Sequence, residues 1–446
     1  MDMNRKMTGA IIAVMISGVL TACASGSDLG RLTTQSETTV EGTITVASSD
    51  AAVKTDTIYK DTDKEYTLND GEDISIDEEG TYLISGQAKN MTVYIDVGDE
   101  DEVTLVLSDA DITNDDVPCI YVKNAKKVIV ETKNGTENTL KVTEEFKEGD
   151  DNGDAVIYSK DDLVLSGDGT LVISSADNAV KSNDDLKIKS GTYIIDCEKN
   201  ALRANDDIEI EDGTITVNSC NDGIHAENDD DDTKGSILIT GGIIKITAED
   251  DAIHATTTVQ IDDGTLTLTG AECIEATQIT VNGGDINITA SDDGINAAQK
   301  SSSLTPEFTL NGGNVVIRMG QGDTDGVDSN GNIYINGGTI DIEGQSAFDY
   351  DGAAEYNGGT MIVNGEETDT ITNQFMGGFP REFKGDPGSM PRGGFGGEFN
   401  GEFDGNFDNG FEGERGEMLH PGPGGDMNPE DFKGKAPDES GEKRKR

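Results

Sequence analysis

The sequence predicts an all-β protein, a right-handed single-stranded parallel β-helix with three short strands in each coil of about 22 residues. First, a landmark such as Asp-Gly-Ile or Asn-Ala-Val recurs from Asn178 to Asp325 at intervals of 22, 22, 29, 21, 21 and 32 residues. Second, a glycine followed by alternating apolar residues recurs in step, as in Gly264-Thr265-Leu266-Thr267-Leu268. Third, a similar alternation precedes each glycine. Alternation with period two indicates strands, and no helical pattern interrupts the series.

The N-terminus resembles a bacterial lipoprotein signal. Arg5 and Lys6 precede an apolar run, residues 10–20, which is too short to span a bilayer. Leu20-Thr21-Ala22-Cys23 then resembles a lipobox, which implies cleavage before Cys23 and lipidation of that cysteine. We therefore expect a signal peptide over residues 1–22, export, and anchoring to the outer face of the bacterial cell membrane. Residues 23–69 are expected to form a tether and an irregular N-terminal segment.

Residues 70–373 are predicted to form the β-helix. The repeats before Asn178 are weaker but alternate in the same way, as in Val103-Thr104-Leu105-Val106-Leu107. The two long intervals contain insertions at residues 228–234 and 299–306. The spacing of the remaining cysteines matches no disulfide framework or zinc signature, so we expect small buried residues at Cys119, Cys197, Cys220 and Cys273.

Residues 374–446 have a different composition, rich in Gly, Phe and Pro and ending in Lys443-Arg444-Lys445-Arg446. Phenylalanine recurs every four residues from Phe395 to Phe411, but the glycines between would each cost a helix about 1 kcal/mol. We expect a disordered acidic tail with a basic end. Contact of this tail with cell-wall polymer or protein, and an inert extension, both stay open.

The charge balance excludes nucleic acid as a partner. The chain has 88 Asp and Glu against 33 Lys and Arg, a formal net charge of −55. A protein that binds nucleic acid needs a basic face to displace counterions, and most of this chain offers none.

Acidic residues recur at the turn that enters the first strand of each coil, and stacking places them about 5 Å apart. Two carboxylates at that distance repel by roughly 3 kcal/mol at an effective dielectric of 20, so a cation is expected between them. Calcium binds carboxylate, carbonyl and amide oxygens, and the turns contain all three. The candidate calcium ligands are Asp222, Asp250, Asp251, Asp292, Asp293 and Asp325.

A second row is expected to face outward three residues after the turn. It contains Lys181, Arg203, His225, His254, Glu275, Asn296, Asp328 and Asp349. Its cationic members, Lys181, Arg203, His225 and His254, are the candidate ligand-binding residues. Aromatic platforms for sugar rings are scarce, with Tyr334, Tyr350 and Tyr356 as the candidates.

A long series of landmarks resembles the clostridial carbohydrate-binding β-helix proteins, which bind cellulose and acidic plant polysaccharides. Among the matching segments are Gly80-Thr81-Tyr82-Leu83-Ile84, Ile120-Tyr121-Val122-Lys123-Asn124-Ala125 and the repeated Asp-Gly-Ile and Asp-Ala-Ile turns. The resemblance covers roughly 300 residues. It implies a calcium-containing β-helix similar to pectate lyases, with Asp222 and Asp293 as the most direct calcium candidates, and binding of polygalacturonate-like polymers without established catalysis.

The favoured function is therefore a surface-anchored, calcium-dependent, non-catalytic carbohydrate-binding protein that recognises an acidic polysaccharide, polygalacturonate-like, or cellulose. Two alternatives stay open. A calcium-dependent polysaccharide lyase of the pectate type would use Arg203 or Lys181 as the base and His225 as a proton carrier. A structural adhesin or wall protein would use the solenoid only to project the tail.

Overall fold

The computed structural model describes residues 62–147, 153–228, 230–321 and 324–373. These ranges contain 36 strands and no helix, and all fall within one compact unit of the chain, Met1–Arg381. None of them holds a helix long and apolar enough to cross a membrane. The signal peptide, Cys23, most of the tether and the tail predicted from the sequence lie outside the described residues.

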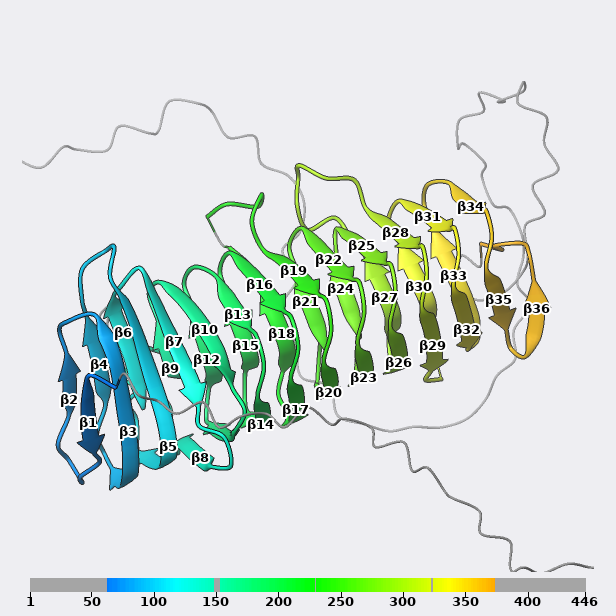
Figure 1. The fold of residues 1–446 in the computed structure, drawn as a ribbon. Coiled ribbons are helices and arrows are strands. Elements are labelled where there is room, and N and C mark those ends of the chain that lie inside the picture. The colour runs from blue at the N-terminus through cyan, green and yellow to red at the C-terminus, as the bar shows by residue number, and fades with distance from the viewer. Residues whose placement is uncertain (1–61, 148–152, 229, 322–323, 374–446) are drawn as a thin grey trace, which may run out of the picture. The chain divides into compact units, whose positions relative to one another are not determined.

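The strands stack into three faces, and neighbouring strands within each face run parallel except at the end of the stack (Figure 1). Face I is a twelve-stranded sheet made of β2 (Ile74–Ile76), β4 (Val93–Asp96), β6 (Ile120–Asn124), β9 (Ala155–Ser159), β12 (Asn178–Ser182), β15 (Asn200–Ala204), β18 (Asp222–Ala226), β21 (Ile253–Ala255), β24 (Ile274–Ala276), β27 (Asp293–Ala297), β30 (Asp325–Ser329) and β33 (Ser346–Tyr350). Face II consists of β1 (Lys64–Thr67), β3 (Gly80–Lys89), β5 (Glu102–Asn114), β7 (Lys127–Thr132), β10 (Asp162–Gly167), β13 (Leu186–Ile188), β16 (Asp207–Ile210), β19 (Ser236–Ile239), β22 (Thr258–Ile261), β25 (Gln278–Val281), β28 (Glu307–Leu310), β31 (Asn332–Ile335) and β34 (Ala354–Tyr356).

Face III begins beside the second half of β5. It contains β8 (Glu137–Val142), β11 (Thr170–Ser175), β14 (Thr192–Cys197), β17 (Thr214–Ser219), β20 (Ile243–Thr247), β23 (Thr265–Gly270), β26 (Asp285–Ala290), β29 (Asn314–Met319), β32 (Thr339–Glu343), β35 (Thr360–Val363) and β36 (Glu366–Thr368). Only β35 and β36, at the end of the described stack, pair antiparallel. The long strands β3 and β5 pair across both faces, with a register shift between Ser85 and Gly86 that bends the chain.

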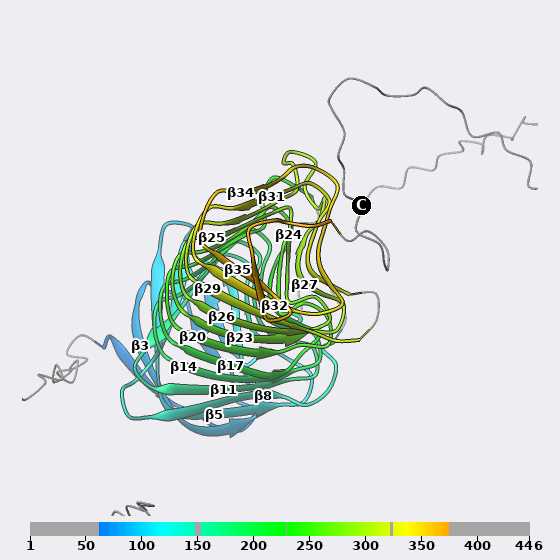
Figure 2. The same cartoon turned by 90° about the vertical axis from the view of Figure 1, so that its right-hand side faces the viewer.

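This architecture confirms an all-β protein of stacked parallel strands, and it is consistent with the parallel β-helix predicted from the sequence. The view along the stack shows successive coils lying one behind another (Figure 2). Strand β1 begins at Lys64, before the predicted start of the solenoid at residue 70, and pairs with β3. Its side chains help to cover the first coil, where Leu68 is already buried.

The interior is filled by in-register rows of aliphatic side chains. Leu266, Ile286 and Val315 are aligned on β23, β26 and β29, and each is 0% exposed. Asn287, between Ile286 and Ile288, is exposed, so the predicted inward and outward alternation is confirmed. The four predicted buried cysteines, Cys119, Cys197, Cys220 and Cys273, are buried free thiols.

The recurring glycine occupies the turn before each face III strand. Gly284 has a φ of 88°, and a Cβ atom there would lie 2.9 Å from the carbonyl oxygen of Gly264 one coil below. Only glycine accepts both the left-handed backbone and this close stacking without strain. The recurring glycine is therefore required by the backbone geometry of the stacked coils.

The two insertions lie next to each other at the edge of face I. One leads from β18 to β19 and the other from β27 to β28, and both project on the same side of the stack (Figure 1). The backbone N–H of Ser302 donates a hydrogen bond to Asp232 across 2.8 Å, which joins them. Lys300, in the second insertion, is thereby carried to the outer surface of face I.

Candidate functional site

Face I presents one side chain per coil in a continuous outward row. In order along the stack these are Ser75, Tyr94, Tyr121, Tyr158, Lys181, Arg203, His225, His254, Glu275, Asn296, Asp328 and Asp349. Parallel strands bring neighbours to about 4.8 Å. The predicted alignment from Lys181 to Asp349 is confirmed, and the row changes along its length from aromatic through basic and imidazole to acidic.

A second row, the turn row, lies three residues earlier in each coil from β12 onward. Its members are Asn178, Asn200, Asp222, Asp251, Glu272, Asp293, Asp325 and Ser346. Carboxylate oxygens in this row accept backbone hydrogen bonds from the next coil, as Asp293 does from the N–H of Asp325 at 3.1 Å. The fold therefore places one residue of each row side by side in every coil.

The sequence analysis overlooked the aromatic end of the outward row. The ring centroids of Tyr94 and Tyr121 are 5.9 Å apart and those of Tyr121 and Tyr158 are 5.3 Å apart, while Lys123 lies 4.5 Å from the Tyr94 ring. Tyr121 and Tyr158 are buried, and Tyr94 is half-buried. Each tyrosine follows an apolar residue in the alternation that was read correctly from Lys181 onward, and that signal could have revealed them.

The tyrosines proposed from the sequence as sugar platforms lie elsewhere. Tyr334 and Tyr356 are on face II, and Tyr356 donates a hydrogen bond to the carbonyl of Gly359 at 2.7 Å. Tyr350 is on face I, but one position beyond the outward row, and packs against the core. None of the three belongs to the row.

The basic segment consists of Lys181 and Arg203. Lys181 forms an ion pair with Asp154 at 2.8 Å, and only 16% of its side chain is exposed. The Nε atom of Arg203 is buried and has no hydrogen-bond partner among the described residues. Arg203 is therefore the member of this segment with an unused donor.

The histidine segment consists of two stacked imidazoles held by carboxylates. The rings of His225 and His254 are 4.5 Å apart and within 7° of parallel. His225 uses its two nitrogens separately, Nδ1 against Asp222 at 2.9 Å and Nε2 against Glu227 at 3.1 Å. Burial disfavours ionisation of Asp222, but its hydrogen bond to His225 outweighs this and lowers its pKa; His225 likewise lowers the pKa of Glu227 to about 2.

His254 brings both its carboxylate partners to one nitrogen. Its Nδ1 lies 2.7 Å from Oδ2 of Asp251 and 3.0 Å from Oε2 of Glu275, which is also 2.8 Å from Nζ of Lys300. Burial alone would lower the pKa of His254, but the two carboxylates raise it to about 10. These groups line a surface hollow of about 300 Å³, which Asp222, His225, Asp250 and Glu272 complete.

The acid end consists of Asp328 and Asp349 of the outward row with Asp293 and Asp325 of the turn row, and the strand register stacks these carboxylates in successive coils. Burial, reinforced by the negative charge of Asp328, raises the pKa of Asp293 to about 7, and burial with the charge of Asp349 raises that of Asp328 to about 6. Asn296 is buried between the segments and donates from Nδ2 to Glu272 at 2.8 Å. Its Oδ1 is buried without a hydrogen-bond partner among the described residues.

The six predicted calcium ligands fall into two groups. Asp222 and Asp251 line the hollow, with Asp250 exposed at its rim. Asp293 and Asp325 lie in register at the acid end, with Asp292 exposed beside them. The coil of Glu272 and Glu275 separates the groups, so the residues do not converge on one ion.

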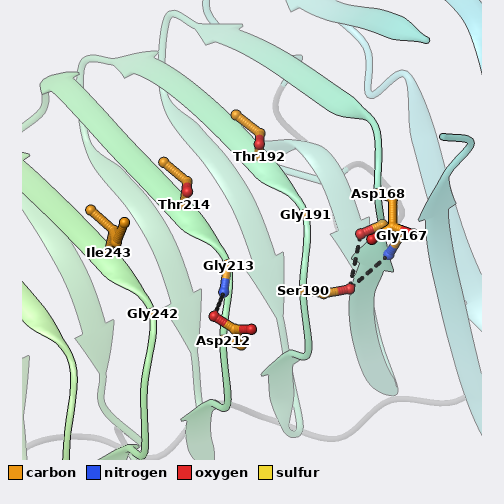
Figure 3. A pocket seen from close by; sticks show the side chains of 10 residues that line it. All are labelled: Gly167, Asp168, Ser190, Gly191, Thr192, Asp212, Gly213, Thr214, Gly242 and Ile243. Atoms are coloured by element: carbon orange, nitrogen blue, oxygen red, sulfur yellow. Dashed lines mark hydrogen bonds between the residues drawn. The ribbon is translucent and has the colours of Figure 1, made fainter. Parts of the chain in front are cut away.

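A second hollow, of about 370 Å³, lies over the turns between faces II and III (Figure 3). Glycines line much of it, including Gly167, Gly191 and Gly213, and its charged members are Asp168 and Asp212. Few side chains converge there, in contrast to the outward row.

Comparison with known proteins identifies the family. A family model described as carbohydrate-binding domain-containing protein matches residues 70–326, more than half of the 446-residue chain. A carbohydrate-binding domain-containing protein of Acetivibrio thermocellus is 37% identical over 123 residues, which cover 27% of this chain and 43% of that relative's length. A solved structure, the gadolinium derivative of a polysaccharide lyase-like protein from C. thermocellum, shares 31% identity over 50% of this chain and 93% of that one, with a TM-score of 0.43. This chain belongs to the family of carbohydrate-binding domain-containing proteins.

Proposed function

We propose that this protein binds an acidic polysaccharide along face I and that calcium bridges the protein to the carboxylates of the sugar. The observation that carries the proposal is the crowding of carboxylates at the end of the outward row, where burial and neighbouring negative charge raise the pKa of Asp293 and of Asp328. An acidic glycan would be repelled by a chain of net charge −55 unless a cation stood between them.

The acid end fits a calcium ion better than the histidine segment does. Asp293, Asp325, Asp328 and the Oδ1 of Asn296 supply only oxygen donors, which calcium prefers. The unpartnered Asn296 oxygen and the raised pKa values of Asp293 and Asp328 are what a site deprived of its cation would have. At Asp222 and Asp251 the carboxylates are already hydrogen-bonded to imidazole nitrogens, so the calcium proposal is placed at the acid end.

The other segments of the row would contact the same glycan chain. The row runs over twelve coils, on the order of 50 Å, which is long enough for an extended polysaccharide. Arg203 is half-buried on the outward row and would offer its guanidinium charge to a sugar carboxylate, and the half-buried Tyr94 offers a ring face toward the opposite end. Cellulose, which has no carboxylates, would depend on Tyr94 and outward polar groups.

The proposal includes the setting inferred from the sequence. The chain would be exported, lipidated at Cys23 and held on the outer face of the cell membrane, with the solenoid coiled as a right-handed single-stranded parallel β-helix. Cell fractionation tests the anchor, since Cys23→Ser should move the protein from membranes to the medium. Unchanged membrane retention would contradict it.

A retention assay on immobilised polygalacturonate, with calcium or with a chelator, tests the binding. Wild type should be retained with calcium and released by chelator. Asp328→Asn should weaken retention at least about tenfold, which corresponds to 1.4 kcal/mol. The matched control is Asp285→Asn, the same change at an exposed acid on face III, which should leave retention unchanged. Retention that ignores the chelator, or that falls equally in both variants, would contradict the proposal.

One observation favours a second function. Arg203 lies in register with His225 one coil away, so the residues expected as base and proton carrier are adjacent on a face proposed to bind calcium. A polysaccharide lyase needs this combination to remove the proton beside a sugar carboxylate. We favour binding without turnover because the hydrogen-bonding nitrogens of His225 are both occupied by carboxylates.

A further inference from the structure

The two histidines differ in how their nitrogens are used, and this difference points to a metal site. His225 faces one carboxylate with each nitrogen, so no single point lies next to one nitrogen and two carboxylates. His254 directs a single atom, Nδ1, at carboxylates from its own coil and the next, Asp251 and Glu275. Among the described residues, these three form the one group of His, Cys, Asp or Glu side chains whose ligand atoms all lie within 4.8 Å of one another.

We propose that Asp251, His254 and Glu275 bind a divalent transition metal of the zinc class, at a site distinct from the calcium site proposed at the acid end. The three ligand atoms all lie within 4.8 Å of one another, and Nδ1 is 2.7 Å and 3.0 Å from the two oxygens. A tetrahedral zinc with bonds of about 2.0–2.2 Å separates its ligands by about 3.3 Å. Movement of Nδ1 by roughly 0.3–0.6 Å would bring its two distances to this value.

The donor set selects against calcium. An imidazole nitrogen is a preferred ligand of zinc, cobalt and nickel, whereas calcium takes oxygen donors. The side chains are also supported as ligands need to be: all three are buried, and the His225 ring stacks on the His254 ring. Asp222 holds the backbone N–H of Asp251 at 3.3 Å, which positions that carboxylate.

Lys300 is the competitor for this site. Its ammonium lies 2.8 Å from the same Glu275 oxygen that would bind the metal. It comes from the insertion between β27 and β28, so its removal leaves the strands intact. Metal binding would displace Lys300 from Glu275 and release the proton held between His254 and the carboxylates, because a ligating imidazole must be neutral.

Titration of the full chain with Zn²⁺, in excess calcium and followed by calorimetry, tests the proposal; Co²⁺ in place of Zn²⁺ reports ligation by its visible absorption. Wild type should bind one zinc saturably. His254→Gln should weaken binding by more than about 100-fold, since even changes to residues behind the ligands cost 10–100-fold. His225→Gln, the same change one coil away, removes only a stacking support and should weaken zinc binding less than His254→Gln does, and Lys300→Met should tighten it. The third histidine, His420, is unchanged in every variant.

Equal zinc affinity in wild type and His254→Gln, or no saturable binding in wild type, would overturn the proposal. Equal losses in the His225 and His254 variants would overturn it as well, because they would place the ion elsewhere. Thermal unfolding shows whether each variant is folded; should His254→Gln fail to fold, Glu275→Gln, which keeps the side-chain shape, replaces it and must lose zinc. The dependence of glycan retention on calcium is measured on the same samples; because it is assigned to the acid end, the chelator should still release His254→Gln from the glycan, so the two metal proposals can fail separately.

Discussion

The histidine segment and the acid end of the outward row share one backbone arrangement and differ in charge. In the coils of Asp222 and Asp251, the residue three positions later is a histidine whose Nδ1 lies 2.9 Å or 2.7 Å from the carboxylate. In the coils of Asp293 and Asp325, that residue is Asn296 or Asp328, which adds no positive charge. The carboxylates of the first segment are paired with imidazole nitrogens of their own coils, while the coils of the second contain no histidine at that position.

This difference shows that the stacking of the coils does not depend on which side chains occupy the outward row. Face I strands keep their register from His225 to Asp349, although the side chains change from imidazole to carboxylate. Apolar residues between the two rows, such as Ile253 and Ile295, are fully buried and hold each coil in place. Function can therefore change coil by coil without a change of fold.

The largest expected effect comes from breaking the scaffold beneath both segments. Ile286→Asp places an unpaired carboxylate in the inward row between Leu266 and Val315. We expect the free energy of unfolding to fall by more than about 4 kcal/mol, or the protein not to fold. Urea unfolding measures it.

The adjacent residue supplies the control for this change. Asn287→Asp introduces the same side chain at an exposed position of the same strand, so its effect should stay within about 0.5 kcal/mol. Equal destabilisation by the two variants would mean that the inward and outward assignment of β26 is wrong.

Much of this scaffold could be predicted from the sequence because it depends on repetition. Alternation places Ile286 inward and Asn287 outward, and a stacked repeat aligns Lys181 with Arg203 and both with His225. The recurring glycines were recognisable because a left-handed turn in each coil allows little else. The alignment of the outward row followed from counting alone.

The ion pairs and hydrogen bonds between side chains of the row could not be predicted in the same way. That His254 meets two carboxylates at one nitrogen depends on rotamers, and that Lys300 reaches Glu275 depends on the path of an insertion. The tyrosine end was overlooked because the intervals there are irregular: Tyr121 follows Tyr94 by 27 residues, and Tyr158 follows Tyr121 by 37. Where the repeat length varies, counting loses the register.

The pH dependence of stability, measured with chelator, should separate the two segments. The folded pKa of Asp293, about 7, lies above its ordinary value of 3.8, so the folded state binds more protons and the free energy of unfolding falls as pH rises from about 4 to 7. For His254 the folded pKa is about 10 against 6.5, so its contribution is complete below 6.5 and is lost as pH rises through 10. In both cases the free energy of unfolding falls as pH rises, but the fall occurs over a different pH range.

Variants assign each window to its segment. Asp293→Asn should reduce the fall in the free energy of unfolding between about pH 4 and pH 7 (the lower window) by about 1–2 kcal/mol after screening by solvent. His254→Gln should reduce the fall between about pH 6.5 and pH 10 (the upper window). Calcium should flatten only the lower window, because it keeps the acid-end carboxylates ionised at no cost in repulsion. If Asp293→Asn instead changed the pH dependence between about pH 6.5 and pH 10, the assignment of the two pH ranges to the two segments would be wrong. Urea unfolding at intervals from pH 4 to pH 10 gives the profiles.

The smallest expected effect is at the basic segment, where binding and catalysis make different predictions. If the protein only binds glycan, Arg203→Ala and Lys181→Ala each remove one attraction to a sugar carboxylate, worth about 1 kcal/mol or less. Lys181→Ala should have the smaller effect, because Lys181 is already paired with Asp154 at 2.8 Å while the Nε of Arg203 is not paired. If Arg203 is instead the base of a lyase, its loss should reduce turnover by about 10²–10⁴-fold and leave binding largely intact.

The measurement that separates the two readings is the absorbance of unsaturated uronate formed from polygalacturonate in the presence of calcium, recorded together with glycan retention. Product formed by wild type and lost only in Arg203→Ala would establish the lyase. We expect no product from any variant and a modest loss of retention, because the carboxylates of Asp222 and Glu227 occupy both nitrogens of the neighbouring His225 and leave neither available to a substrate.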